Sequence, residues 1–183
     1  MFSSNPSSAD GTSATVRVWD PVVRLFHWTV VACCLLDGFV FDDGKSIHRA
    51  IGWIAMGALA VRLVWGFVGT RHARFSDFVP GPRRLVDYLR AFAQGREPRH
   101  IGHNPAAAVM ILALMTLLAA TGLTGWMLTL DAFFGESWLE VLHEAIVTTI
   151  FLLVGVHVGA AIWESLRHRE NLILSMITGT KKA

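Results

Sequence analysis

Four long apolar runs, separated by short polar segments, make up most of this 183-residue chain. Each run is close to the ~20 residues that a helix needs to cross the hydrocarbon core of a bilayer. The runs are apolar on every face, whereas the strands of a membrane barrel alternate in polarity over about ten residues. The pattern therefore predicts an all-α, integral membrane four-helix bundle with helices at about residues 21–41, 47–68, 105–130 and 140–166.

The composition supports a membrane protein, because 53% of the residues are hydrophobic, 16% are charged and the mean hydropathy is +0.47. Such values are rare for a soluble domain. We expect one transmembrane domain over residues 16–180, with a single longer loop at 69–104. Residues 1–15 form a polar leader that we expect to be disordered. It lacks the apolar core of a cleaved secretory signal.

Lys and Arg residues are distributed unequally between the two sides of the predicted bundle. Thirteen of the sixteen fall in the leader region, in the loop between the second and third helices, or in the tail. Short cytoplasmic segments retain basic residues, so this side is predicted to be cytoplasmic and to hold both the N and the C terminus. The opposite loops are short and acidic. With a net charge of +2, the basic loop indicates topology rather than binding to nucleic acid.

Four of the eight histidines lie inside or at the edge of the apolar runs, where an ionisable side chain is costly and points to a function. The predicted topology places His48 and His143 near the outer face, and His27 and His157 near the cytoplasmic face. His143 and His157 are fourteen residues apart, which leaves them near one face of their helix and ~21 Å apart along it. The depths therefore predict two pairs, His48 with His143 and His27 with His157.

A neutral imidazole is a good axial ligand for haem iron, and two imidazoles from facing helices can hold one haem between them. We therefore predict two haem b groups, an outer one bound by His48 and His143 and an inner one bound by His27 and His157. The alternative for each histidine is a hydrogen bond to a neighbouring helix. Zinc hydrolysis is disfavoured, because HEAIV at 143–147 has Val147 where the zinc-protease motif requires a second histidine.

Three arginines are candidate partners for haem propionates, since a guanidinium suits a carboxylate. Arg62 interrupts the second apolar run, on the face of His48 but ~21 Å deeper, at the level of the inner haem. The alternative for Arg62 is that its side chain extends to the cytoplasmic interface. Arg24 precedes His27 by about one turn and Arg49 follows His48 directly, so each is a candidate for a similar role at its own end. Arg49 is the weaker of the two, because adjacent residues of a helix point in different directions.

Three segments of the chain resemble the bacterial cytochrome b561 family, which includes the b-type subunits of nickel-iron hydrogenases. They are RLFHW at 24–28, IHRAIGW at 47–53 and LHEAIVTTIFLLVGVHVGAA at 142–161, and the resemblance extends from about Val16 to Thr180. It implies a four-helix, dihaem, multi-pass protein of the bacterial inner (plasma) membrane, with ligand roles for the same four histidines. Other segments, such as VRVWDP, resemble members that serve periplasmic redox proteins.

Electron transfer across the membrane is the leading hypothesis for function, between the quinone pool and a periplasmic partner such as a cytochrome c or a hydrogenase. An electron-transfer protein or subunit is favoured over an enzyme in its own right. A superoxide oxidase that passes electrons to quinone is one alternative, disfavoured by the acidic outer loops. A non-redox haem-bearing anchor or a metal-ion transporter is another. A homodimer is compatible with the sequence, which contains no feature that decides the oligomeric state.

Overall fold

The computed structural model describes residues 15–40, 46–96, 98 and 100–182. Its elements, in chain order, are β1 (Thr15–Arg17), α1 (Pro21–Phe39), α2 (Ser46–Val68), η1 (Arg71–Ala73), α3 (Phe75–Phe78), α4 (Pro82–Ala93), α5 (Pro105–Met127), η2 (Asp131–Phe133), α6 (Ser137–Arg167), α7 (Leu172–Thr178) and β2 (Thr180–Lys182). The expected disorder of residues 1–15 falls almost entirely outside the described residues, as do Asp42 and Asp43 of the first outer loop.

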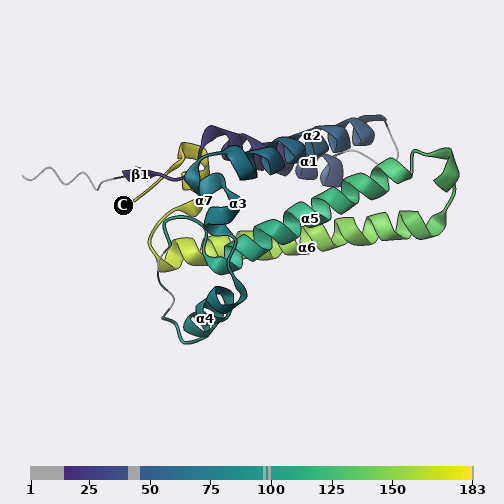
Figure 1. Ribbon diagram of the computed structural model, residues 1–183. Coiled ribbons are helices and arrows are strands. Elements are labelled where there is room, and N and C mark those ends of the chain that lie inside the picture. Colours follow the sequence, from purple (N-terminus) through teal and green to yellow (C-terminus); the bar gives the residue numbers. More distant parts are fainter. Residues whose placement is uncertain (1–14, 41–45, 97, 99, 183) are drawn as a thin grey trace, which may run out of the picture.

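Four helices, α1, α2, α5 and α6, are long and apolar enough to cross a membrane, as predicted. They lie alongside one another in one elongated bundle, with α1 packed on α2, α2 on α5 and α5 on α6 (Figure 1). Many large apolar side chains remain exposed on the outside of the bundle; Phe39 and Phe67, for example, are both 75% exposed. Because soluble proteins rarely expose so much contiguous apolar surface, this surface is suited to lipid.

Two of the four long helices begin at the same kind of signal, an Asx residue followed by proline. Asp20 caps α1 by accepting a hydrogen bond from the Val23 N–H at 2.9 Å, and Asn104 caps α5 by accepting one from the Ala107 N–H at 2.7 Å. A proline at the first helical position needs no hydrogen-bond acceptor, since it has no N–H. These caps set where the apolar runs become helical.

Both ends of the described chain meet at one end of the bundle. β1 pairs antiparallel with β2, with Val16 opposite Lys181, and Trp19 donates from Nε1 to Ser175 Oγ at 3.2 Å. In Figure 1 this end lies on the left, and the α5–α6 connection lies at the other end. We call the end with β1 and β2 the inner end and the opposite one the outer end. The small sheet was not predicted, because strands of three residues carry no detectable periodicity.

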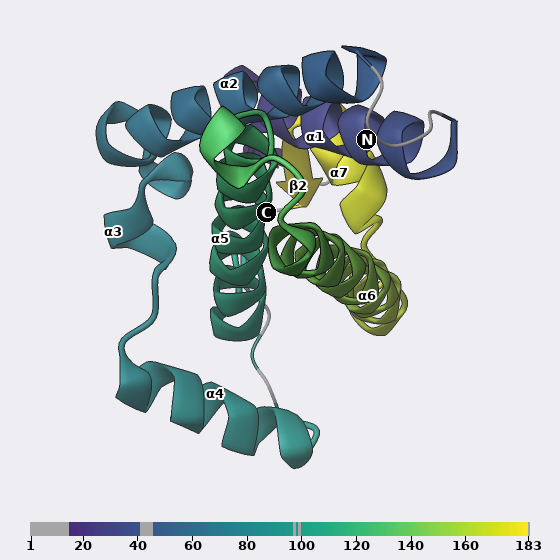
Figure 2. The same ribbon diagram turned by 90° about the vertical axis from the view of Figure 1, so that its right-hand side faces the viewer.

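The segment between α2 and α5 lies at the inner end. α4 is foreshortened in Figure 1 but is seen at full length in Figure 2, so its axis runs across the bundle rather than along it. Tyr88 holds α4 to the bundle, because it is buried and donates a hydrogen bond to Glu164 Oε1 at 3.3 Å. Val86, Leu89 and Phe92 of the same helix stay exposed. Such a crosswise helix with an exposed apolar side is suited to the membrane surface.

Candidate functional site

His48 and His143 come together at the outer end of the bundle. His48 lies in the first turn of α2 and His143 in the second turn of α6, and their ring centroids are 6.3 Å apart with an angle of 77° between the ring planes. Two imidazoles bonded at ~2 Å to opposite sides of one first-row metal ion have centroids roughly 6 Å apart. The spacing therefore fits the two axial ligands of a single iron.

A hydrogen bond on Nδ1 fixes the orientation of each of these two rings. Asp37 Oδ1 lies 2.8 Å from His48 Nδ1, and since a carboxylate only accepts, the His48 N–H must be the donor. Thr124 Oγ1 lies 2.8 Å from His143 Nδ1, and its hydroxyl also lies 2.9 Å from the Ala120 carbonyl, to which it donates. Thr124 therefore accepts from His143. Both rings carry the Nδ1 proton, so Nε2 is the nitrogen suited to bind iron.

His27 and His157 come together at a second depth, nearer the inner end. They project from α1 and α6 and lie close enough to interact electrostatically. His27 packs edge-on against Trp28, with centroids 5.1 Å apart, and its Nδ1 is buried without a hydrogen-bond partner among the described residues. A buried polar atom of this kind is costly unless some further group satisfies it. The structure thus places His48 beside His143 and His27 within electrostatic reach of His157, and the roles of the four as haem ligands stay a prediction.

Gly52 leaves room beside His48. It lies one turn after the histidine, and a Cβ added there would meet no atom within 4 Å. Gly155 and Gly159 are exposed and lie two residues from His157, on roughly the opposite side of α6, so they do not line a space beside that ring. Within the described residues, α6 packs closely on α5 and less closely on α1 and α2. A flat macrocycle needs such space between the helices that carry its ligands.

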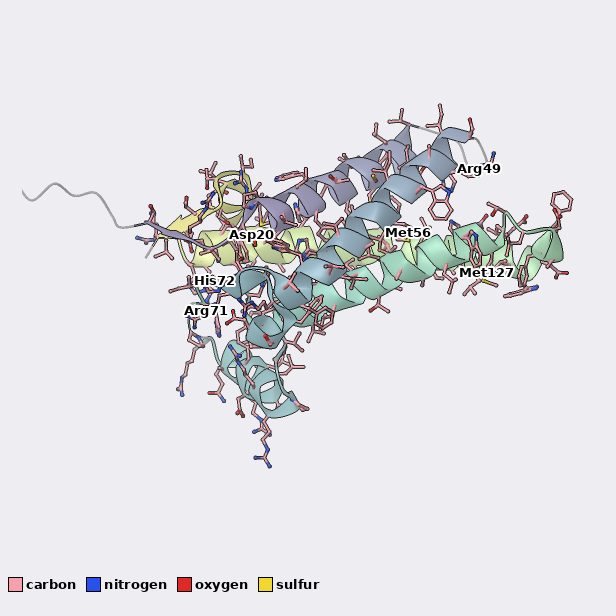
Figure 3. All side chains as sticks on the ribbon, turned by 45° about the horizontal axis from the view of Figure 1, so that its top comes forward. Asp20, Arg49, Met56, Arg71, His72 and Met127 are labelled. Carbon is pink, nitrogen blue, oxygen red and sulfur yellow. The ribbon has the colours of Figure 1, made fainter. Side chains whose placement is uncertain are left out.

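Gly122 and Gly125 of α5, in contrast, are positions of close approach. A Cβ at Gly122 would collide with the Met56 side chain, where α2 crosses α5 (Figure 3). A Cβ at Gly125 would lie 3.2 Å from His143 Cε1. Gly122 therefore serves helix packing, and Gly125 makes room for the histidine itself.

Arg62 is buried near the inner end, with an exposure of 2%. Its Nη2 donates to the Ala73 carbonyl at 3.1 Å, and its guanidinium lies 5.2 Å from the Phe75 ring centroid. Its Nη1 has no hydrogen-bond partner among the described residues, although Asp20 lies within electrostatic reach. The Arg62 side chain thus extends toward the inner end, the direction expected of a side chain that reaches for the membrane interface, but protein covers it there. Its Nη1 could still donate a hydrogen bond to a further acceptor.

The other two arginines occupy different surroundings. Arg24 donates from Nη2 to the Ile177 carbonyl, and its Nε lies 3.4 Å from the Met176 carbonyl, so it ties α1 to α7. Arg49 is exposed at the outer end of α2 (Figure 3). Arg24 therefore has a structural partner already, and the described residues give Arg49 no contact that links it to His48.

The geometry of the site differs from that of a zinc centre. Within the described residues, no group of three or more His, Cys, Asp or Glu side chains converges as metal ligands. Structural and catalytic zinc sites need at least three protein ligands. Two histidine pairs at two depths match axial coordination, in which a macrocycle supplies the other bonds.

The sequence profile of the prokaryotic cytochrome b561 family matches residues 18–179. The chain belongs to this family. As a b-type cytochrome it is a multi-pass membrane protein that binds haem b and takes part in electron transport. The hydrogen-bonded Nδ1 atoms of His48 and His143, the 6.3 Å spacing of their rings and the unpartnered Nδ1 of His27 are the features of this cytochrome that fit such a group.

Curated relatives of this cytochrome b561 are named as probable b-type cytochrome subunits of Ni/Fe-hydrogenase. The protein of Bradyrhizobium diazoefficiens is 25% identical over 92% of this chain and 86% of its own length. That of Rhodobacter capsulatus is 26% identical over 90% and 80%, and that of Cupriavidus necator 26% over 88% and 85%. No solved structure matches the chain significantly.

Three residues of this site were missed by the sequence analysis. Asp37 is an acidic residue inside the first apolar run, which is the same signal that drew attention to Arg62. Thr124 had no such signal, because threonines are common in membrane helices and only its contact with His143 reveals its role. Asp20 could have been found as a helix cap before Pro21, but not as the residue that joins α1 to α2.

Asp20 links the start of α1 to the end of α2. Its Oδ2 accepts hydrogen bonds from Trp65 Nε1 at 2.8 Å and from Thr70 Oγ1 at 2.5 Å. Burial alone raises the pKa of this carboxyl, but these bonds and the Val23 N–H outweigh it, so the net pKa lies below the usual value. Asp20 therefore stays ionised at the inner end.

His103, in the polar segment that precedes α5, packs against aromatic rings at the inner end. Its ring packs against those of Trp19 and Phe78, with centroid distances of 4.6 and 4.9 Å. This burial, together with nearby Lys181 and Arg62, lowers the pKa of His103 to about 3. His103 is therefore neutral at physiological pH and adds no cation to the inner end.

Proposed function

We propose that this cytochrome holds two haem b groups and carries electrons across the bacterial inner membrane between the quinone pool and a redox protein on the outer side. His48 and His143 bind the outer haem iron, and His27 and His157 bind the inner one. The observation that carries the proposal is the His48–His143 pair, whose 6.3 Å spacing suits one iron and whose Nδ1 atoms are both held by hydrogen bonds. Bound haem b supplies one-electron redox chemistry.

The second haem is supported by the repetition of this arrangement along α6. His157 follows His143 by fourteen residues, so the two ligands are ~21 Å apart along the same helix. His27 approaches His157 from α1, as His48 approaches His143 from α2. The unsatisfied Nη1 of Arg62 near the inner end supports a propionate there, with Arg62 as its partner.

The inner end is proposed to face the cytoplasm. It carries both ends of the described chain and the arginine-rich segment around α4, whereas the outer connection between α5 and α6 carries Asp131 and Glu136. Basic residues are retained on the cytoplasmic side. The outer haem would then face the periplasm, where the hydrogenase subunits named among the relatives suggest a hydrogenase-like electron donor.

Proteoliposomes test transport across the bilayer directly. Wild-type protein and His27→Ala and His48→Ala variants are reconstituted around trapped ferricyanide, and dithionite is added outside. We expect rapid reduction of the trapped ferricyanide by the wild type and a large loss of rate in each variant, because each lacks one of the two haem tiers. Equal rates in all three proteins, or a wild-type rate no higher than that of empty liposomes, would refute the proposal.

The same preparation distinguishes the alternatives. Quinol added to the purified protein should reduce the haems, and superoxide should do so no faster. Rapid reduction by superoxide without reduction by quinol would instead indicate a superoxide oxidase. Metal flux without electron transfer would indicate a transporter.

A further inference from the structure

Asp37 is the one acidic residue of α1 and lies near the outer end of this helix. Its Oδ1 lies 2.8 Å from His48 Nδ1, and the two side chains are only 24% and 25% exposed. The contact joins the last turns of α1 to the first turn of α2. A carboxylate in such surroundings is costly unless its interaction with the partner offsets the loss of hydration.

The carboxylate acts on the ring through the Nδ1 proton. It fixes the tautomer of His48, so that the lone pair is on Nε2, and it makes the imidazole a more basic ligand. A more basic axial ligand stabilises ferric iron over ferrous iron, which lowers the reduction potential. Hydrogen bonding around the ligands is one of the means by which a protein sets this potential.

This interaction distinguishes the two haem tiers. His143, the other outer ligand, bonds to the neutral Thr124 hydroxyl. Within the described residues, no carboxylate lies at ion-pair distance from His27 or His157, and His27 Nδ1 has no hydrogen-bond partner there. Within the described residues, a carboxylate therefore accepts a hydrogen bond from the outer pair of histidines and not from the inner pair.

We propose that Asp37 is a positioning residue that acts through His48 to hold the outer haem at a lower potential than the inner haem. The inference rests on the proposed two-haem function and adds to it a direction of electron transfer, from the outer haem to the inner one. With both haems bound, an electron passed from the outer to the inner haem would oxidise the first and reduce the second, and the lower potential of the outer haem would make this transfer downhill.

Redox titration of the purified holoprotein tests the proposal, with Asp37→Asn as the main variant. Asparagine keeps a hydrogen-bond acceptor but removes the charge, so both haems should be retained. We expect the ferric-to-ferrous ratio of the outer haem at a fixed potential to fall about tenfold. For a one-electron couple this corresponds to a rise of ~59 mV in the reduction potential of that haem. The inner haem should not change. Asp37→Glu, which keeps the charge, should restore most of the difference.

Asp131→Asn is the matched control, since Asp131 is an exposed carboxylate at the same end of the bundle. An equal shift in this control, an unchanged outer potential in Asp37→Asn, or equal shifts of both haems would overturn the role of Asp37. The EPR g-values of the outer haem give a second readout, because they report ligand basicity and should change only in Asp37→Asn.

A comparison of His27→Ala with the wild type provides a second test, which does not depend on the folding of Asp37→Asn. In His27→Ala, which should keep only the outer haem, the remaining potential should match the lower wild-type potential. A match to the higher one would contradict the proposal. Absence of any bis-histidine haem from the wild type would instead refute the proposed function.

Discussion

The imidazole rings of His48 and His143 have their centroids 6.3 Å apart and their planes nearly perpendicular, although about half of the chain separates the two residues in the sequence. The Nδ1 atom of each ring makes a hydrogen bond: that of His48 to the Asp37 carboxylate of α1, and that of His143 to the Thr124 hydroxyl of α5. All four transmembrane helices therefore contribute to the outer pair. The arrangement makes the orientation of the two ligands a property of the whole bundle.

Thr124→Val should weaken the outer haem site specifically. Valine keeps the shape of threonine but removes the acceptor for His143 Nδ1, and loss of such an outer contact typically costs 10–100-fold in metal affinity. We expect outer haem to be lost more readily during purification and inner haem to be retained, as measured by pyridine haemochrome content and the redox titration. Thr116→Val is the control, since that exposed hydroxyl bonds only to its own helix. Equal haem retention in the two variants would contradict the role of Thr124.

Gly125→Ala should disturb the same site by crowding. The added methyl group would lie 3.2 Å from His143 Cε1, so the ring must tilt away from its hydrogen bond with Thr124. We expect a shifted or heterogeneous EPR signal for the outer haem and an unchanged signal for the inner one. Gly57→Ala is the control, because a Cβ there meets no atom within 4 Å. An outer signal as sharp as that of the wild type would show that the close approach does not matter.

Arg62→Gln should lower the potential of the inner haem. Removing a buried positive charge beside a haem disfavours the ferrous state, and it leaves a propionate without its partner. Inner-haem content should also fall, while the outer haem stays unchanged. Arg71→Gln changes the charge at the same end of the bundle but on an 84% exposed side chain, so it serves as the control. Unchanged inner-haem content and potential in Arg62→Gln would exclude the propionate contact.

Asp20→Asn should destabilise the bundle in a pH-dependent way. The hydrogen bonds from Thr70 and Trp65 lower the folded-state pKa of Asp20 below its unfolded value, so its stabilisation is present above the unfolded pKa and is lost as pH falls through the folded one. At neutral pH the variant should lose about 1–3 kcal/mol of unfolding free energy. Thermal unfolding followed by circular dichroism measures this, and the gap from wild type should narrow as pH falls below the ordinary Asp pKa of 3.8 and close below the lower folded-state pKa.

The control for this prediction is Asp87→Asn. Asp87 is 75% exposed and lies 3.9 Å from Arg90, so its contribution to stability is small. If both variants lose the same stability, or if the deficit of Asp20→Asn is independent of pH, the link between α1 and α2 through Asp20 is wrong.

The four spans could be predicted because their signal is local: each is a single apolar run of about the length that a bilayer requires. The relative depths of the four histidines could also be worked out, since depth follows from topology and helical rise, whereas their roles as haem ligands stay a prediction. β1 and β2 were not, because their pairing depends on contacts between opposite ends of the chain. Asp37 and Thr124 were missed for a related reason, as the partner of a side chain on another helix cannot be read from the position of either residue.

The most direct test of the central claim is a redox titration of the visible spectrum of the purified protein and of four variants, each with one of His27, His48, His143 or His157 replaced by alanine. Our account predicts two bis-imidazole transitions in the wild type. Replacing His48 or His143 should remove one of them, and replacing His27 or His157 should remove the other. A single transition in the wild type, or loss of the same transition on replacing His48 and His27, would contradict the two-tier arrangement.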